Sequence, residues 1–348
     1  MTTNALLDFS GLPRFDAIAP SDVQPAIDRL LADGRTLIER LTADAVPATW
    51  DAFAAPLGDG IENLSRAWGI VGHLHSVNDV PEWREAYNGM LPEVSRFYAE
   101  LGQNLKLFAK YKALRESPEY ATLSPARRKI VDNEVRDFHL SGAELPEDRK
   151  PRFQAIQEEL ASLAAKFSEN LLDATNAFAE LVTDETELAG LPDDVREAAR
   201  HAAEKDGALT NTRGWKFTLH MPSYLPVMQY AESRRLRAAL YRAHATRAAE
   251  FGPAELDNTP LIRRLLELRR EEAQLLGYAN FAEVSLVPKM AESVPQVLAF
   301  LRDLAVKARP FAEKDIAELR DFARTELGIA TLEPWDVGYA SEKLRQRE

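Results

Sequence analysis

The chain has 348 residues, and its 43 Lys and Arg against 55 Asp and Glu give a formal net charge of -12. Apolar residues make up 45% and charged residues 28%, a globular composition that excludes disorder along the whole length. The negative charge argues against a dedicated nucleic-acid binder, and the absence of cysteine excludes disulfide scaffolds, zinc fingers, iron–sulfur sites and thiol nucleophiles.

The chain carries no targeting or membrane signal. Its first residues contain neither a basic region nor a long apolar run, so they do not form a signal peptide. No stretch reaches the roughly 18 apolar residues that a membrane helix needs. Short basic runs at 127–129, 234–235 and 269–270 alternate with apolar residues at helical spacing, and we interpret them as solvated helix faces. We therefore expect a cytoplasmic protein that binds neither nucleic acid nor membrane.

The first informative element is a helical stretch from Leu64 to Leu74, beside the only close pair of histidines, His73 and His75. Residues two positions apart on a helix point to opposite sides, so these two cannot bind one metal ion together. We expect one packed and one exposed histidine. The motifs H-E-x-x-H and Glu-x-x-His are absent, as are the P-loop, the dinucleotide fingerprint and the nucleophile elbow.

Two long helices are predicted by apolar residues three or four positions apart. The first runs over about Arg152 to Glu180, and the second over about Val294 to Ala323. Pro310 lies inside the second and predicts a kink or a break, because proline lacks an N–H and clashes with the preceding turn. Gly277 and Gly328 follow leucine at positions where a helix is expected to end.

Strand signals are few. Residues 179–183 and 215–221 can form strands, and they can pair across a helical insert over about 192–205. The predicted fold is mainly α and multi-helical, with one small β ribbon. No repeat of 30–45 residues is present, which argues against a helical solenoid. No linker marks a clear domain boundary, and the one candidate subdivision lies near 145–150.

The C-terminal stretch predicts a helix without an end signal. Leu332–Asp336 is typical of a turn into a new element, and Val337–Leu344 begins an amphipathic pattern. The sequence then stops at Glu348 with no cap glycine, proline or polar tail. We expect the chain to be truncated inside a longer protein; a frayed native terminus is the alternative.

Ten stretches, taken in order, resemble the thimet-oligopeptidase-like zinc metallopeptidases. Each alone is weak, but their number and order cover nearly the whole chain. The stretches are Leu12–Phe15, Ile18–Ala26, His73–Val77, Glu82–Tyr87, Val131–Gly142, Asn170–Thr175, Pro222–Met228, Leu276–Phe281, Lys289–Ala291 and Glu333–Asp336 with Tyr339 and Ser341–Lys343.

The resemblance implies a helical protein of roughly twice this length, whose two halves flank a channel in which short, unstructured peptides are cut. In that family an H-E-x-x-H helix and a downstream Glu bind zinc, and the Glu of the motif activates the bound water. All of these residues would lie beyond Glu348. The resemblance therefore implies zinc and a C-terminal catalytic half for the intact enzyme. It implies no catalytic residue, no metal ligand and no activity for these 348 residues.

What remains for this chain is one wall of the channel. Tyr224, Asp336 and Tyr339 are exposed-looking candidates for contact with the peptide, although all three also suit turn and packing positions. A stand-alone helical binding or scaffold protein is the alternative function. If a second half is missing, apolar surface meant for it should face water. We therefore expect one apolar flank and self-association through it.

Overall fold

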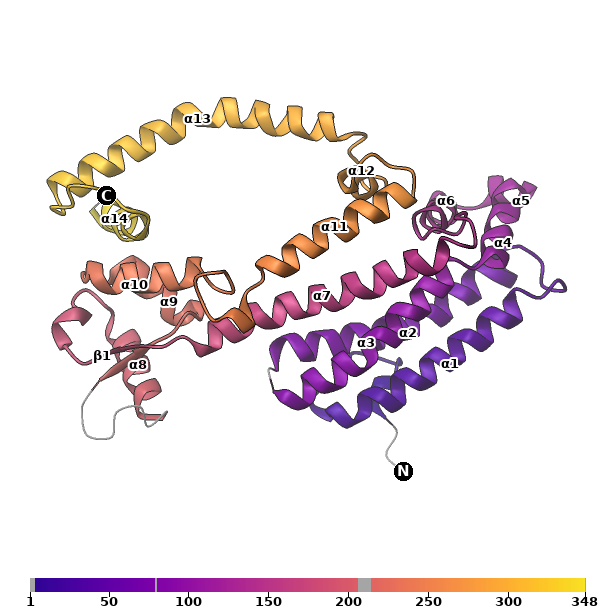
Figure 1. Ribbon diagram of the computed structural model, residues 1–348, viewed down its shortest axis with the longest axis horizontal. Helices are drawn as coiled ribbons and strands as arrows, with labels where there is room; N and C mark the ends of the chain where they lie inside the picture. Colours follow the sequence, from indigo (N-terminus) through magenta and orange to yellow (C-terminus); the bar gives the residue numbers. More distant parts are fainter. Residues whose placement is uncertain (1–3, 79, 206–213, 348) are drawn as a thin grey trace. The chain divides into compact units, whose positions relative to one another are not determined.

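A computed structural model describes residues 4–78, 80–205 and 214–347. These residues form fourteen α-helices and one two-stranded sheet (Figure 1), so the prediction of a mainly α fold with one β ribbon is confirmed. The helices are α1 (Val23–Leu41), α2 (Ala55–Val77), α3 (Pro81–Gly102), α4 (Leu105–Glu116), α5 (Pro118–Thr122), α6 (Pro125–Leu140), α7 (Lys150–Ala177), α8 (Asp193–Lys205), α9 (Met221–Tyr230), α10 (Arg234–Ala245), α11 (Thr259–Leu275), α12 (Phe281–Leu286), α13 (Val294–Thr325) and α14 (Pro334–Arg347). The strands are β1 (Glu180–Val182) and β2 (Trp215–Phe217).

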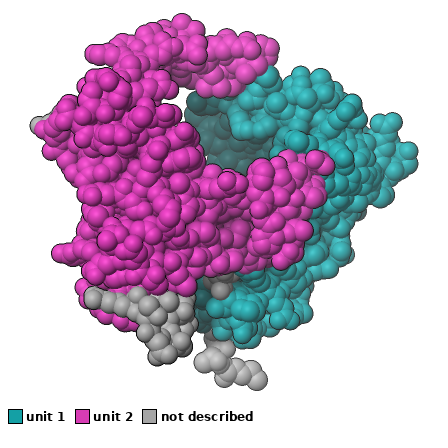
Figure 2. Space-filling view, turned by 60° about the vertical axis from the view of Figure 1, so that its left-hand side comes forward, with its two compact units in different colours: residues 1–165, 264–294 teal, residues 166–263, 295–348 magenta. Residues whose placement is uncertain are grey.

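The chain divides into two compact units (Figure 2). Unit 1 consists of residues 1–165 and 264–294, and unit 2 of residues 166–263 and 295–348. Each unit is therefore built from two separate stretches of chain, a division that composition alone does not reveal. The division expected near 145–150 lies at the start of α7 and stays a prediction.

Unit 1 is a helical assembly in which α1, α2 and α3 lie side by side (Figure 1). Amphipathic spacing on the three helices buries one apolar cluster, which includes Ile27, Val71 and Phe97. A second cluster lies where α4 and α6 meet, around Leu107 and Phe138. Fully burying side chains of this size stabilises the fold by about 1.5–3 kcal/mol each.

The β ribbon of unit 2 is antiparallel and pairs Glu180 with Phe217 and Val182 with Trp215. It packs with α8, α9 and α10 around a buried cluster that contains Leu188, Leu236 and Leu240, among others. The strand predicted over 179–183 is one residue shorter at each end, whereas the strand predicted over 215–221 ends at Phe217 and Met221 begins α9. The expected helical insert forms as α8. None of the helices among the described residues is long and apolar enough to cross a membrane.

The two long helices form where the apolar spacing predicts them, as α7 and α13. Of the kink or break expected at Pro310, the break is wrong, because α13 continues through that residue, and the kink stays a prediction. Pro310 removes the hydrogen bond to the carbonyl of Val306, but Val306 is 73% exposed and water can replace the lost donor. Gly277 and Gly328 have φ angles of 82° and 66°, which confirms both predicted helix ends.

Candidate functional site

The two histidines of the close pair on α2 differ in burial. His73 is exposed, and its ring lies 5.3 Å from that of Phe15. His75 is half-buried and stacks on Tyr87, with the ring centroids 4.4 Å apart. The prediction of one packed and one exposed histidine is confirmed.

A zinc site needs three or four His, Asp, Glu or Cys side chains that converge on one point. Within 4–78, 80–205 and 214–347, the structure brings together no group of three or more such side chains that could hold a metal ion. The donor set of these residues therefore does not fit zinc, and we derive no step of chemistry in this chain through a metal.

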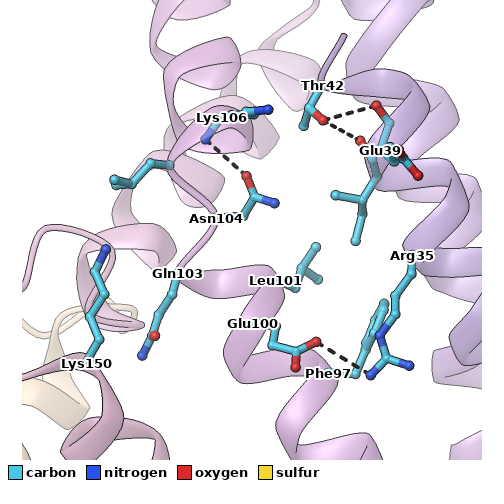
Figure 3. A pocket seen from close by; sticks show the side chains of 12 residues that line it. Arg35, Glu39, Thr42, Phe97, Glu100, Leu101, Gln103, Asn104, Lys106 and Lys150 are labelled. Atoms are coloured by element: carbon cyan, nitrogen blue, oxygen red, sulfur yellow. Dashed lines mark hydrogen bonds and ion pairs between the residues drawn. The ribbon is translucent and has the colours of Figure 1, made fainter. Parts of the chain in front are cut away.

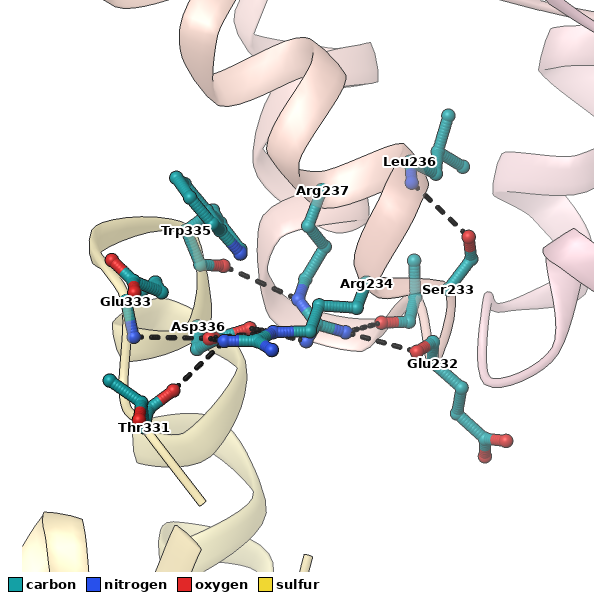
Figure 4. A network of polar contacts seen from close by, with 10 residues as sticks. Glu232, Ser233, Arg234, Leu236, Arg237, Thr331, Glu333, Trp335 and Asp336 are labelled. Atoms are coloured by element: carbon teal, nitrogen blue, oxygen red, sulfur yellow. Dashed lines mark hydrogen bonds and ion pairs between the residues drawn. The ribbon is translucent and has the colours of Figure 1, made fainter. Parts of the chain in front are cut away.

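The most strongly organised polar cluster in unit 2 joins the start of α10 to the start of α14 (Figure 4). Ser233 caps α10 by accepting a hydrogen bond from the Leu236 N–H at 3.1 Å. Two arginines three positions apart on α10 then reach one carboxylate on α14. Arg234 Nη2 lies 2.7 Å from Asp336 Oδ2, and Arg237 Nη2 lies 2.8 Å from Asp336 Oδ1. We call these three residues the Asp336 clamp.

Burial makes the clamp different from a surface ion pair. The side chain of Asp336 is 0% exposed and that of Arg237 is 1% exposed, whereas Arg234 keeps 47% of its side chain in solvent. Arg237 also donates to the carbonyl oxygens of Ala231 at 2.6 Å and Trp335 at 3.3 Å. These acceptors offset the free-energy cost of removing the Arg237 guanidinium from water, as long as Asp336 stays ionised.

The clamp should make the stability of unit 2 sensitive to acid. Burial by itself would raise the pKa of Asp336, but the hydrogen bonds from Arg234, Arg237 and the Glu333 N–H, together with the charge of Arg234, hold that pKa below its ordinary value. A carboxylate whose pKa is lower in the folded state than in the unfolded state stabilises the folded protein. This contribution is complete above the unfolded-state pKa of about 3.9, and it is lost as the pH falls through the folded-state pKa.

We therefore expect the urea midpoint, followed by tryptophan fluorescence, to fall between about pH 5 and about pH 3. It should fall less in Asp336→Asn, which has no titrating group at this position. The other carboxylates are common to both proteins, so the difference between the two profiles isolates Asp336. Parallel profiles would contradict the assignment.

The three candidates for peptide contact occupy different surroundings. Asp336 and Tyr339 are buried, so the expectation that they are exposed is wrong. They lie on the side of α14 that packs on α10, and the Tyr339 ring centroid is 4.1 Å from Arg237 Cζ. Tyr224 on α9 is half-buried and stacks on His244 at 4.3 Å, and this burial raises its pKa. A role in peptide contact stays a prediction for all three.

Unit 1 contains a cavity of about 520 Å³ next to α1, the end of α3 and the start of α4 (Figure 3). Arg35 and Glu100 pair at 3.5 Å in its wall, and Asn104 caps α4 by accepting from the Lys106 N–H at 3.0 Å. The Nε2 atom of Gln103 is buried with no hydrogen-bond partner among the described residues. Charges of both signs line this cavity, so it does not select an ion of one sign.

The exposed apolar flank expected from the sequence is present on α13. Every residue from 298 to 315 is exposed. Five large apolar side chains in this stretch are between 43% and 72% exposed. At 100° per residue they fall within an arc of about 160° on the helix. We call this set the α13 apolar face; its members are Leu298, Phe300, Leu301, Leu304 and Phe311.

Two family models match the chain. The one described as "Peptidase family M3" matches residues 227–348, and the one described as "Neurolysin/Thimet oligopeptidase, N-terminal domain" matches residues 27–150. Oligopeptidase A of Salmonella typhimurium is 44% identical over 346 residues, and that of Escherichia coli is 45% identical over 346 residues. Each alignment covers 99% of this chain and 50% of the relative. Probable cytosolic oligopeptidase A of Arabidopsis thaliana is 40% identical over 99% of this chain and 49% of its own length.

These matches assign the chain to the N-terminal region of the M3 peptidase family, of the thimet oligopeptidase type. More particularly, the chain is homologous to the N-terminal half of oligopeptidase A, which confirms the resemblance predicted from the sequence. The chain spans about half the length of the curated relatives that it matches.

Proposed function

We propose that this chain forms the non-catalytic, N-terminal channel wall of a zinc-dependent oligopeptidase that cleaves short, unstructured peptides. One observation carries the proposal: 99% of the chain aligns at 44% identity with an oligopeptidase A, yet it spans 50% of that relative and contains no H-E-x-x-H. Zinc and the residues that activate water would then belong to the catalytic half. These 348 residues alone would be inactive.

The α13 apolar face supports a role as one of two halves. Contiguous exposed apolar patches on folded proteins usually mark the place of a partner. A helix with no packed residue over more than four turns also gains little stability by itself, since most helical stability in proteins comes from packing of an apolar face. In our proposal the catalytic half packs against this face. Self-association of the separate chain through the same face, and a cytoplasmic location, stay predictions.

A complementation experiment tests the proposal. The chain is co-expressed with the half of Escherichia coli oligopeptidase A that it does not match, and hydrolysis of a quenched fluorescent peptide is measured. We expect no hydrolysis by either half alone and chelator-sensitive hydrolysis by the pair. The control is a catalytic half whose H-E-x-x-H glutamate is replaced by glutamine. Co-expressed with the chain, it should give no hydrolysis of the peptide.

Two results would overturn the proposal. Chelator-sensitive hydrolysis by the purified chain alone would place the chemistry within these residues. A chain that folds and is monodisperse, yet neither binds nor activates the catalytic half, would favour the alternative of a stand-alone helical binding or scaffold protein.

A further inference from the structure

Unit 1 contains a second cavity, of about 370 Å³, next to α2, α3, α7 and α11. This volume lies within the range of small-molecule sites in proteins, which is about 300–1,000 Å³. Its walls are mainly apolar, with a few polar groups. The chemistry of the cavity is set by one acidic side chain, Glu272 on α11, together with Gln157 on α7.

Glu272 is a buried carboxyl group with one unused oxygen. The residue is 8% exposed, and its Oε1 accepts a hydrogen bond from Gln157 Nε2 at 3.0 Å. Its Oε2 is buried and has no hydrogen-bond partner among the described residues. Burial raises the pKa of this group. An unpaired buried acceptor costs free energy, so the second carboxyl oxygen of this cavity-lining residue calls for a donor.

The adjacent glutamate shows that this arrangement is not a general property of α11. Glu271 is half-buried, and Arg152 Nε donates to its Oε1 at 2.6 Å. Arg269, on the same helix, lies over the ring of Phe281, with its Cζ atom 5.1 Å from the ring centroid. Within the described residues, neither arginine is hydrogen-bonded to Glu272.

The other walls favour an organic cation. Trp68, Tyr98 and Phe153 line the cavity, and Ser95 contributes a hydroxyl group. Aromatic faces attract a cation through the ring quadrupole, most strongly when water is excluded. One carboxylate does not suffice for a zinc ion, which takes three or four protein ligands. A carboxylate among aromatic side chains instead suits an ammonium group on an apolar body.

We infer that this cavity binds a small primary ammonium ion with an apolar body, and that Glu272 Oε2 accepts a hydrogen bond from the ammonium group. The ion is either a free amine or the N-terminal ammonium group of a very short apolar peptide, since both present the same chemistry. The inference rests on unit 1 alone and does not depend on the proposed function.

Isothermal titration calorimetry of the full chain tests this inference, with phenethylamine as the first probe. We expect binding in the millimolar range or tighter. Glu272→Gln keeps the shape and removes the charge, and should weaken binding at least about tenfold. Glu271→Gln is the matched control at the next position of α11 and should change binding less than about twofold. Ser95→Leu narrows the cavity without touching the carboxylate and should also abolish binding.

A second set of titrations identifies the source of the ammonium group. The dipeptide Leu-Leu and its N-acetylated form differ only at the terminal amine. Binding of Leu-Leu but not of the acetylated form supports a peptide N-terminus, and binding of phenethylamine alone supports a free amine. The inference is overturned if no amine binds up to about 10 mM, if Glu272→Gln binds as well as the wild type, or if acetylated Leu-Leu binds as tightly as Leu-Leu.

Discussion

Replacement of Asp336 by asparagine is expected to lower the free energy of unfolding by about 3–5 kcal/mol at neutral pH. The variant keeps the size of the side chain but removes the only carboxylate of the Asp336 clamp. Arg237, which is 1% exposed, would then be a buried cation without a counter-ion. Arg234 contributes less to the loss, because 47% of its side chain is in solvent and water can replace its partner.

Urea unfolding followed by tryptophan fluorescence measures this loss, since Trp335 precedes Asp336 and Trp215 lies in the same unit. The control is Asp303→Asn, which breaks the exposed pair with Lys307 on α13 at 2.7 Å and should cost less than about 1 kcal/mol. The double variant Arg237→Met/Asp336→Leu should recover much of the stability, because it leaves no buried charge unpaired and Arg234 keeps 47% of its side chain in solvent. Equal losses for Asp336→Asn and the control would refute the role of the clamp.

The sequence predicted the helical fold well, because helices are local. The apolar spacing of α7 and α13 and the glycines that end α11 and α13 all depend on neighbours within a few residues. Pro310 does not break α13, and the reason is physical. Its cost depends on whether the freed carbonyl of Val306 meets water, and exposure is a property of tertiary structure.

The polar sites were harder to predict, because each joins residues distant in the chain. Asp336 looked like an exposed turn residue, and Arg234 looked like part of a solvated basic face. Their partnership spans about a hundred positions and needs α10 and α14 to pack together. Glu272 cannot be told from Glu271 by periodicity alone, since both lie on one helix among charged neighbours. Only the placement of Gln157 against α11 distinguishes them.

Replacement of Leu301 by glutamate on the α13 apolar face is expected to weaken complementation by the catalytic half at least about 100-fold. Leu301 is 52% exposed in this chain, so the change should leave the chain's own unfolding midpoint nearly unaltered. In the assembled enzyme the same position would be covered. The variant would lose about 1.5–3 kcal/mol of apolar burial and would also bury an unpaired carboxylate.

Val306→Glu provides the matched control, because Val306 is an apolar residue of the same helix that is 73% exposed and lies outside the arc of the α13 apolar face. Peptidase activity is titrated by adding either variant to a fixed amount of the catalytic half. A loss confined to Leu301→Glu identifies the face as the contact. Equal losses in both variants would indicate a general weakening of α13, and full activity in both would place the catalytic half on another surface of the chain.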